Sequence, residues 1–461
     1  MNRKAIAITL TAAMTAAMSV SAFAADPVYD DVTVGETGTD LTAEISLLTN
    51  RTDMLDESYT GTTWAQYLEE FNKIYPNITV DVEGDTNYAE DSLLRLQGGD
   101  YSDIVMIPQV DLAELPNYFI SFGDLSTLQD EVRFASTKAY DGQVYGIPIT
   151  GNAQGVVYNK AVFEKAGITE LPKTPDEFIE DLQKIKDNTD AIPLYTNYAA
   201  GWTMGAWDAY ITGTATGLST YENQILPHEQ NPFEDKGNGA HAYNVYRVLY
   251  EAVQKGLTED DYSTTDWESC KGMINNGEIG CLVLGSWAVT QMQGAGDHPD
   301  DIGYMPFPMT VDGTMYASAG PDYMFGINCN SSDDNKLAAM IFVKWMTEQS
   351  GFSYNEGGMP ISLSDDKWPE LYSAFDGVTY VASDPALEGE EALMTDLNAD
   401  SELGINARGN EKVQGIVEAA ATGSESFDDL MAEWNQKWSD AQEMDGAEVI
   451  YTDITSETEA E

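Results

Sequence analysis

The sequence predicts an α/β protein of two or more domains, each with a mainly parallel sheet flanked by helices. Between residues 44 and 107, three apolar strand-like segments alternate with two amphipathic segments. This βαβαβ order is typical of a parallel sheet covered by helices. The alternation returns after residue 155, and 461 residues are enough for two or three separate cores.

The first amphipathic segment has the clearest signals. Thr63 followed by Gln66 forms a capping box, large apolar side chains then recur at helical spacing, and Pro76 ends the helix. A second helix stops at Gly98 and Gly99. The strands of this half are expected at 44–48, 78–82 and 103–107.

The second half contains the same kinds of elements without an internal repeat. Residues 155–158 and 279–284 are predicted strands, and Thr174, Pro175 and Glu177 mark the start of a helix. Further helices are expected near 241–255, 267–274, 336–346, 412–421 and 427–438.

The N-terminus has the features of a secretory signal peptide. Arg3 and Lys4 precede a mildly apolar run, and Ala22-Phe23-Ala24 places small residues at a cleavage site. Ser and Thr residues interrupt the run, which argues against a membrane anchor. We therefore expect residues 1–24 to be removed and the protein to be exported, to the periplasm or to the extracellular side of the cell envelope. The polar, acidic residues 25–42 and 440–461 are expected to form a flexible lead-in and a loose tail.

The chain is strongly acidic, with 78 Asp and Glu against 22 Lys and Arg and a formal net charge of -56. Such a surface repels phosphate backbones and anionic membranes, so nucleic acid is excluded as a partner. Solubility in a secreted setting explains the acidity. Attraction of a cationic ligand, such as a polyamine or a metal, is the alternative, although the acids are spread along the chain.

The three cysteines are Cys270, Cys281 and Cys329. None lies at the predicted cleavage site, so no lipid-anchor cysteine is expected, and none has metal-ligand spacing. The odd number leaves at least one free thiol in a monomer. Buried thiols are expected, and a Cys270–Cys281 disulfide stays open.

The patterns of common catalytic sites are missing. His228, His241 and His298 lack metalloprotease spacing, no G-x-S-x-G elbow occurs, and the glycine-containing segment that ends at Ser286 lacks a phosphate-binding lysine. We therefore expect a binding protein without a cofactor, not an enzyme. A secreted carbohydrate-active hydrolase stays open, because a glycosidase needs only two carboxyl groups about 5–10 Å apart.

The nine tryptophans fall into two groups. Helix-core spacing predicts burial for Trp64, Trp267, Trp345, Trp434 and Trp438. The others lie near Gly or Pro, outside amphipathic patterns: Trp202, Trp207, Trp287 and Trp368. Trp287 follows a predicted strand, at the end where open α/β sheets bind ligands. Flat rings cover the apolar faces of a sugar while amide and charged groups bind its hydroxyls, so Trp287 is a candidate sugar platform, with core packing as the alternative.

Several segments, taken in order, resemble the extracellular solute-binding proteins of carbohydrate ABC importers, of the maltose-binding-protein kind. The resemblance extends from Ile45 to Trp438 and rests on residues 64–80, 98–104, 142–148 with 157–160, and 273–287. It implies a two-lobed periplasmic-binding-protein fold with hinge-linked lobes, each an open sheet flanked by helices. The implied lobes are residues 43–149 with 309–348, and 150–308 with 349–439, with crossings near 149–150, 306–308 and 348–351.

The resemblance also implies a ligand site in the cleft between the lobes. By position, its residues are Asn50, Arg51 and Asp53 after the first strand, Gln109 after the third, Asn152 past the first crossing, the ring-stacking Trp202 and Trp287, and Gly320, Asp322 and Tyr323 in a cleft-facing loop. Alternatives are an ion pair for Arg51, a helix cap for Asp53 and a hinge turn for Asn152. Asn410 stands where the family has an aromatic residue, which leaves the sugar and the number of its subsites open.

The implied function is capture of a sugar or oligosaccharide by interlobe closure, followed by delivery to the membrane permease of an ABC importer. The protein is expected to act as a monomer. The same fold with a polyamine, metal or peptide ligand stays open because of the acidity.

Overall fold

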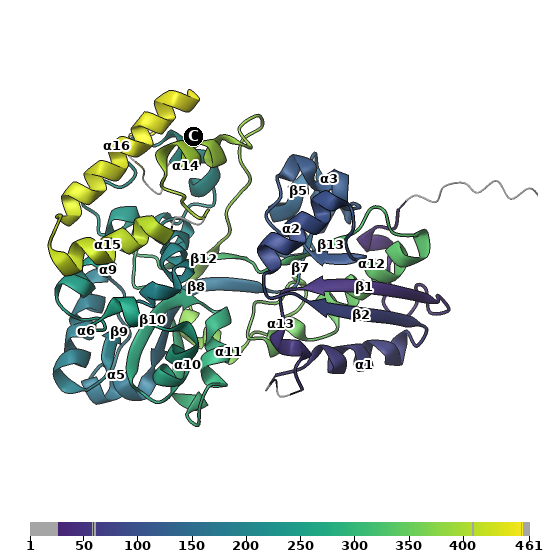
Figure 1. The fold of residues 1–461 in the computed structure, drawn as a ribbon, viewed down its shortest axis with the longest axis horizontal. Coiled ribbons are helices and arrows are strands. Elements are labelled where there is room, and N and C mark those ends of the chain that lie inside the picture. Colours follow the sequence, from purple (N-terminus) through teal and green to yellow (C-terminus); the bar gives the residue numbers. More distant parts are fainter. Residues whose placement is uncertain (1–25, 58, 60, 408–409, 453, 455–461) are drawn as a thin grey trace, which may run out of the picture.

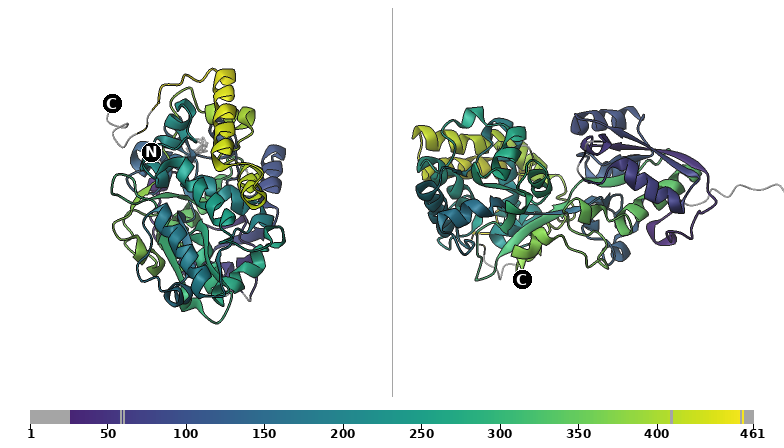
Figure 2. Two further views of the ribbon diagram at one scale, coloured as in Figure 1. Left: turned by 90° about the vertical axis from the view of Figure 1, so that its left-hand side faces the viewer. Right: turned by 90° about the horizontal axis from the view of Figure 1, so that it is seen from below.

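The computed structural model describes residues 26–57, 59, 61–407, 410–452 and 454. Two lobes lie along the long axis of the molecule and are joined by extended segments, among them strands β8 (Gly151–Asn159) and β12 (Tyr316–Pro321) (Figures 1 and 2). The two-lobed α/β architecture is therefore confirmed. The predicted signal peptide lies outside the described residues.

Lobe 1 is built on a five-stranded sheet with the order β2-β1-β3-β13-β7. Its strands are β1 (Ala43–Thr49), β2 (Ile78–Gly84), β3 (Ile104–Met106), β7 (Ile147–Pro148) and β13 (Met324–Ile327). The three predicted strands β1, β2 and β3 are parallel neighbours. Their carboxyl ends therefore share one edge of the sheet, where open α/β sheets bind ligands. A separate small sheet consists of β4 (Gly123–Asp124), β5 (Ala139–Tyr140) and β6 (Gln143–Val144).

Helix α1 (Trp64–Ile74) begins at the predicted capping box. The Gln66 N–H donates to the Thr63 hydroxyl, and the Thr63 N–H donates to the Gln66 side chain. The apolar face of α1 packs on α12 (Asp333–Glu348), where the Phe71 and Phe342 ring centroids are 5.1 Å apart. The remaining helices of the lobe are α2 (Tyr88–Gly98), α3 (Leu115–Tyr118), α4 (Leu125–Leu128) and α13 (Phe352–Asn355).

Lobe 2 contains a six-stranded sheet with the order β14-β12-β8-β10-β9, and β11 also pairs with β8. The additional strands are β9 (Ile192–Leu194), β10 (Ile279–Gly285), β11 (Ile302–Pro306) and β14 (Thr379–Val381). β8 runs antiparallel to β10, β11 and β12. The sheet is therefore mixed: β9, β10, β11, β12 and β14 run in one direction, and β8 alone runs in the other.

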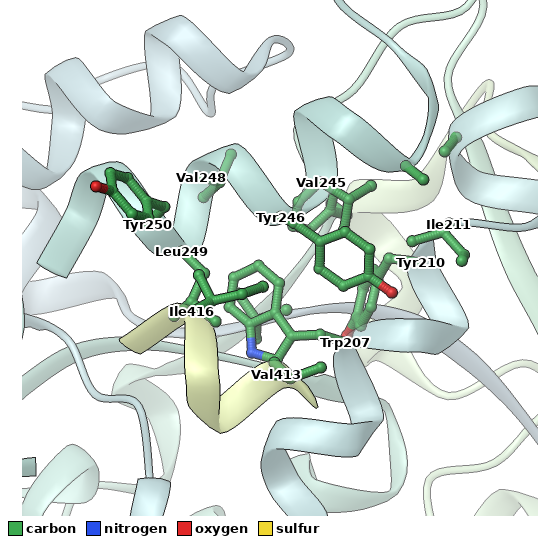
Figure 3. Close-up of a cluster of buried hydrophobic side chains, with 14 of the residues drawn as sticks. Trp207, Tyr210, Ile211, Val245, Tyr246, Val248, Leu249, Tyr250, Val413 and Ile416 are labelled. Atoms are coloured by element: carbon green, nitrogen blue, oxygen red, sulfur yellow. The ribbon is translucent and has the colours of Figure 1, made fainter. Parts of the chain in front are cut away.

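Helices surround the sheet of lobe 2. They are α5 (Lys160–Ala166), α6 (Pro175–Asn188), α7 (Trp202–Gly205), α8 (Gly213–Thr216), α9 (His241–Gln254), α10 (Trp267–Asn275), α11 (Trp287–Gln293), α14 (Leu393–Ser401), α15 (Asn410–Thr422) and α16 (Phe427–Asp445). In the core, Trp207 and Tyr210 pack with Tyr246 of α9 and Val413 of α15 (Figure 3). Trp207 is only 2% exposed, so its expected place outside the core is wrong.

The first crossing between the lobes lies at 149–150, where β7 gives way to β8. The second lies between Pro321 and Met324, where β12 of lobe 2 leads into β13 of lobe 1, and not at 306–308. The apolar side chains of Phe307, Met309 and Val311 hold that earlier segment in the core of lobe 2. Residues 309–321 therefore belong to lobe 2.

The third crossing is also later than the expected 348–351. Phe352 and Ile361 are buried in the core of lobe 1, whereas Trp368 packs against a cluster of lobe 2. Between them, Met359 forms an isolated antiparallel bridge with Gly151. Residues 349–361 thus lie at the boundary between the lobes, attached mainly to lobe 1.

The described parts of the two acidic end segments pack on the lobes. Tyr29 and Val32 are buried in the core of lobe 1, and the Lys344 ammonium donates to the Tyr29 carbonyl at 2.9 Å. At the other end, α16 continues past residue 440 and Ile454 is buried against lobe 2. The structure therefore differs from the expected loose lead-in and tail, because a few apolar side chains within each acidic segment find places in the cores.

Candidate ligand-binding site between the lobes

Three tryptophans form a cluster on lobe 2. Trp202, Trp267 and Trp287 are the first residues of α7, α10 and α11. The ring centroid of Trp202 is 5.0 Å from that of Trp267 and 5.6 Å from that of Trp287, and the last two are 5.7 Å apart. Trp202 is 41% exposed, so the cluster presents apolar ring surface to solvent. Trp267, which helical spacing assigned to the core, is half-buried beside the two predicted platform residues.

The position of Trp287 follows from the end of β10. This strand is buried along its whole length and ends at Gly285, which pairs with Gln154 of β8. A Cβ at Gly285 would lie 2.6 Å from the Trp287 ring nitrogen. Glycine is therefore required for the indole to approach the strand end this closely.

A chain of hydrogen bonds leads from the aromatic cluster to the crossing strands. The Ser286 hydroxyl donates to the Asn152 side-chain oxygen at 3.1 Å, and the Asn152 amide donates to an Asp322 carboxylate oxygen at 3.4 Å. The Asp322 N–H donates to the Thr150 carbonyl at 2.9 Å. Asn152 therefore connects the first crossing to the second, as its alternative role in the hinge requires, and its contact with a ligand stays a prediction.

Arg51 lies within a cluster of carboxylates on lobe 1. Its guanidinium binds both Asp53 oxygens at 2.9 Å, and it donates to a Glu356 oxygen at 2.7 Å. The Tyr59 hydroxyl donates to the same Glu356 oxygen at 2.7 Å. Arg51 thus has the ion pairs named as its alternative, whereas Asp53 is not a helix cap, because it lies inside a short 3₁₀ turn that Thr52 precedes.

Burial and the neighbouring charge have opposite effects on the pKa of Asp322. Loss of solvent raises the pKa of its carboxyl, and the Tyr323 N–H, the Arg51 charge and the Asn152 amide oppose that shift without cancelling it. Burial acts to lower the pKa of Arg51, but the hydrogen bond to Asp53 and the charges of Glu356 and Asp53 outweigh it and raise the value. Arg51 therefore stays charged, and its field reaches Asp322 at the lobe boundary.

The other predicted site residues lie outside the hydrogen-bond chain of Asn152 and the ion pairs of Arg51. Asn50 is half-buried after β1, and Gln109 is exposed after β3. The Tyr323 ring packs edge-on against Tyr88, with centroids 5.3 Å apart. Gly320 lies on β12, opposite Asn152 on β8, and is therefore part of a strand and not of a loop.

A cavity of about 1080 Å³ adjoins this arrangement and is lined by both lobes. Lobe 1 contributes residues 134, 136–137 and 139–141, and lobe 2 contributes Gln154, Ser318, Gly320 and the segment 381–386. Gln154 and Asn152 lie on the same face of β8 because side chains alternate along a strand. The cavity therefore begins next to the polar chain that links the crossing strands.

Sequence reasoning missed Tyr59, Trp267 and Glu356. Glu356 reaches Arg51 only through the fold, since it is 305 residues away, whereas Tyr59 is only eight residues from Arg51 and no sequence motif marked it. Asp266 caps α10, so Trp267 is the first residue of that helix. Its helical spacing was recognised correctly, but spacing alone predicted burial and did not indicate that the ring is partly exposed at the helix start.

Among the described residues, no group of three or more His, Cys, Asp or Glu side chains could hold a metal ion. The three cysteines are free, with Cys270 and Cys281 buried. Burial raises the pKa of Cys270 to about 12. The thiols of Cys270 and Cys281 therefore have the character of small core residues, whereas Cys329 is partly exposed.

Two α/β lobes, joined by crossing strands and carrying aromatic and polar groups at their common boundary, define a two-lobed ligand-binding protein. The chain belongs to the bacterial extracellular solute-binding protein family, whose model matches residues 56–351. Its role is accordingly to bind a substrate.

The chain is similar to a manno-oligosaccharide specific solute binding protein, BlMnBP2 of Bifidobacterium animalis subsp. lactis, solved in complex with mannotriose. The two are 54% identical, the match covers 91% of this chain and 99% of the other, and the TM-score is 0.86. BlMnBP1 of the same organism, the binding protein of an ABC transporter solved with mannobiose, is also 54% identical over the same shares, with a TM-score of 0.86. The multiple sugar-binding protein of Streptococcus mutans is 23% identical, over 65% of this chain and 72% of its own length.

Proposed function

We propose that this protein captures a manno-oligosaccharide between its lobes and delivers it to the membrane permease of an ABC importer. The observation that carries the proposal is the 54% identity, over 91% of the chain, to a protein solved with mannotriose.

The site has the chemistry that sugar binding needs. The indoles of Trp202, Trp267 and Trp287 offer flat apolar surface for the C–H faces of pyranose rings. Asn152, Asp322 and the Arg51 cluster offer donors and acceptors for hydroxyl groups. The adjoining cavity of about 1080 Å³ is lined by Gln154 and by residues of both lobes other than these groups, and it is slightly larger than the usual ligand site, which suits a chain of several sugar units.

Closure of the lobes is the expected response to the ligand. The aromatic cluster belongs to lobe 2 and the Arg51 cluster to lobe 1, so a ligand that touches both stabilises the state in which the lobes are near each other. In keeping with its family, we expect the protein to act as a binding protein without a cofactor, and not as an enzyme. The permease would then recognise the closed form of a monomer.

Export is part of the proposal, since the family is extracellular and residues 1–24 have the features of a signal peptide. No helix in the described part of the chain has the length and apolarity needed to cross a membrane.

Calorimetric titration of the mature protein with mannobiose, mannotriose, maltotriose, cellotriose and spermidine tests the proposal. We expect the mannosides to bind and to raise the melting temperature, because a ligand at a hundredfold excess over its Kd adds about 2.7 kcal/mol of stability. Binding of spermidine alone, or of no mannoside, would overturn the assignment. Chromatography of the incubated sugars separates binding from hydrolysis, since intact mannotriose is the expected product.

A further inference from the structure

One carboxylate oxygen in the Arg51 cluster accepts no hydrogen bond from the described part of the chain. The Glu356 side chain is 6% exposed, and its Oε2 accepts from both Arg51 and Tyr59 at 2.7 Å. Its Oε1 is equally buried and has no hydrogen-bond partner among the described residues. Buried carboxylate oxygens are normally paired, because an unmade bond leaves the cost of desolvation uncompensated.

The position of Glu356 places this oxygen at the boundary between the lobes. Glu356 directly follows α13 of lobe 1 and directly precedes Gly357 and Gly358. A Cβ at Gly357 would lie 2.7 Å from the Thr290 side chain on α11, the helix that Trp287 begins. A Cβ at Gly358 would clash with the Thr150 hydroxyl at the first crossing. The chain therefore runs from the Arg51 cluster onto the helix of the aromatic platform within two residues.

The hydrogen bonds of the cluster leave this oxygen without a donor among the described residues. Arg51 is shared by two carboxylates, of which Asp53 takes the bidentate contact and is 47% exposed. Glu356 is the buried member, and it receives two bonds on one oxygen and none on the other. A neutral hydroxyl donor could satisfy the second oxygen without adding charge to the cluster.

We propose that Glu356 is a sugar-recognition residue, whose Oε1 accepts a hydrogen bond from one hydroxyl group of the bound oligosaccharide while Oε2 holds Arg51 and Tyr59 in place. The inference rests on the proposed function and deepens it. It gives the boundary segment 356–358 a direct part in selecting the sugar, beside the aromatic platform.

A purely structural role for Glu356 makes a different prediction. If the carboxylate only fastens the boundary segment to Arg51, its loss weakens all sugars by the same factor. If Oε1 recognises a hydroxyl, its loss removes the discrimination between the sugar with that hydroxyl and the analogue without it. A double-mutant cycle between protein and ligand separates the two.

The experiment measures Kd by calorimetry for mannotriose and a set of its monodeoxy analogues, with wild type, Glu356→Gln and Glu356→Ala. We expect both variants to bind mannotriose about tenfold to a hundredfold more weakly, the range for a hydrogen bond to a charged group. We also expect one deoxy analogue to bind the wild-type protein more weakly than mannotriose does, by a similar factor. The Glu356 variants should bind that analogue and mannotriose with equal affinity.

Two variants serve as matched controls. Tyr59→Phe removes the second bond to Oε2 but leaves Oε1 unchanged, so the discrimination between analogues should persist. Glu251→Gln alters a Glu that also binds an arginine at 2.8 Å, on α9 in lobe 2, and should leave every Kd unchanged.

An equal loss for all analogues in both Glu356 variants would overturn the inference, and so would unchanged affinity of folded variants. Melting curves of the unliganded variants confirm that they are folded. If wild type binds no mannoside, the proposed function fails instead, and the same cycle run with the sugar that does bind decides the role of Glu356.

Discussion

The indole of Trp287 lies 5.6 Å, between ring centroids, from the indole of Trp202, and the two rings are tilted by 49° to each other. They begin different helices, and both also contact the ring of Trp267. The aromatic cluster is therefore formed by three helix starts, and each ring restrains the others. Loss of one ring should weaken sugar binding without unfolding the lobe.

Replacement of Trp287 by Ala should lower the affinity for mannotriose at least about tenfold, because the ring surface that covers the sugar is lost. Calorimetric titration measures the change, and far-UV circular dichroism should show a folded protein. Trp207→Ala is the contrasting variant: this indole is 2% exposed in the core, so its loss should lower the free energy of unfolding by about 3–5 kcal/mol. An unchanged titration curve for Trp287→Ala would count against the platform.

Lys412→Met should destabilise lobe 2 strongly. The Lys412 ammonium lies 2.7 Å from an Asp208 oxygen, and the two side chains are 3% and 1% exposed. The substitution leaves the buried Asp208 charge unpaired, which costs about 3–5 kcal/mol in comparable pairs. Urea unfolding measures the loss.

The exposed pair of Lys437 and Glu433 provides the control, since its atoms are 2.9 Å apart and its side chains 41% and 50% exposed. Lys437→Met should change the free energy of unfolding by less than about 1 kcal/mol. Equal effects of the two lysine variants would show that burial does not set the strength of the Lys412 pair.

Asp322 should make stability depend on pH in a predictable direction. Burial raises the pKa of its carboxyl above the ordinary 3.8. The folded state therefore holds the proton more tightly than the unfolded state does, so this contribution is complete below the ordinary pKa and is lost as the pH rises through the raised value. Asp322→Asn lacks this loss, and its stability should rise relative to wild type across that window.

Urea unfolding of wild type and Asp322→Asn at a series of pH values checks this difference. Parallel stability curves for the two proteins, or a variant that loses stability relative to wild type as the pH rises, would contradict the assigned shift.

One thiol of the native protein should react readily with a thiol reagent, and two should be protected from it. Cys270 and Cys281 are buried, and burial raises the pKa of both, whereas Cys329 is partly exposed. A thiol reagent such as DTNB should therefore modify one cysteine of the native protein at neutral pH and three after unfolding without reductant. One modified cysteine in the unfolded protein would show that two of the three are joined, and if the modified residue is Cys329, that Cys270 and Cys281 form the disulfide that the sequence left open.

Local patterns in the sequence determined the elements. The capping box at Thr63 and Gln66, the cap at Thr174 and the apolar strand 279–284 all form as predicted, because each depends on neighbours within a few residues. The order of these elements also placed Trp287 at the end of a strand. The two-lobed architecture followed from the resemblance of successive segments.

Only the tertiary structure decided which side chains meet. Glu356 joins Arg51 across 305 residues, Trp267 joins Trp202 and Trp287, and Trp207 enters the core. The second and third crossings lie later in the chain than predicted, because Phe307 is buried in lobe 2 and Phe352 in lobe 1. No local sequence pattern indicates in which lobe these side chains are buried. Secondary structure depends on short-range periodicity, whereas the site is formed by long-range packing between segments whose relative positions the fold alone sets.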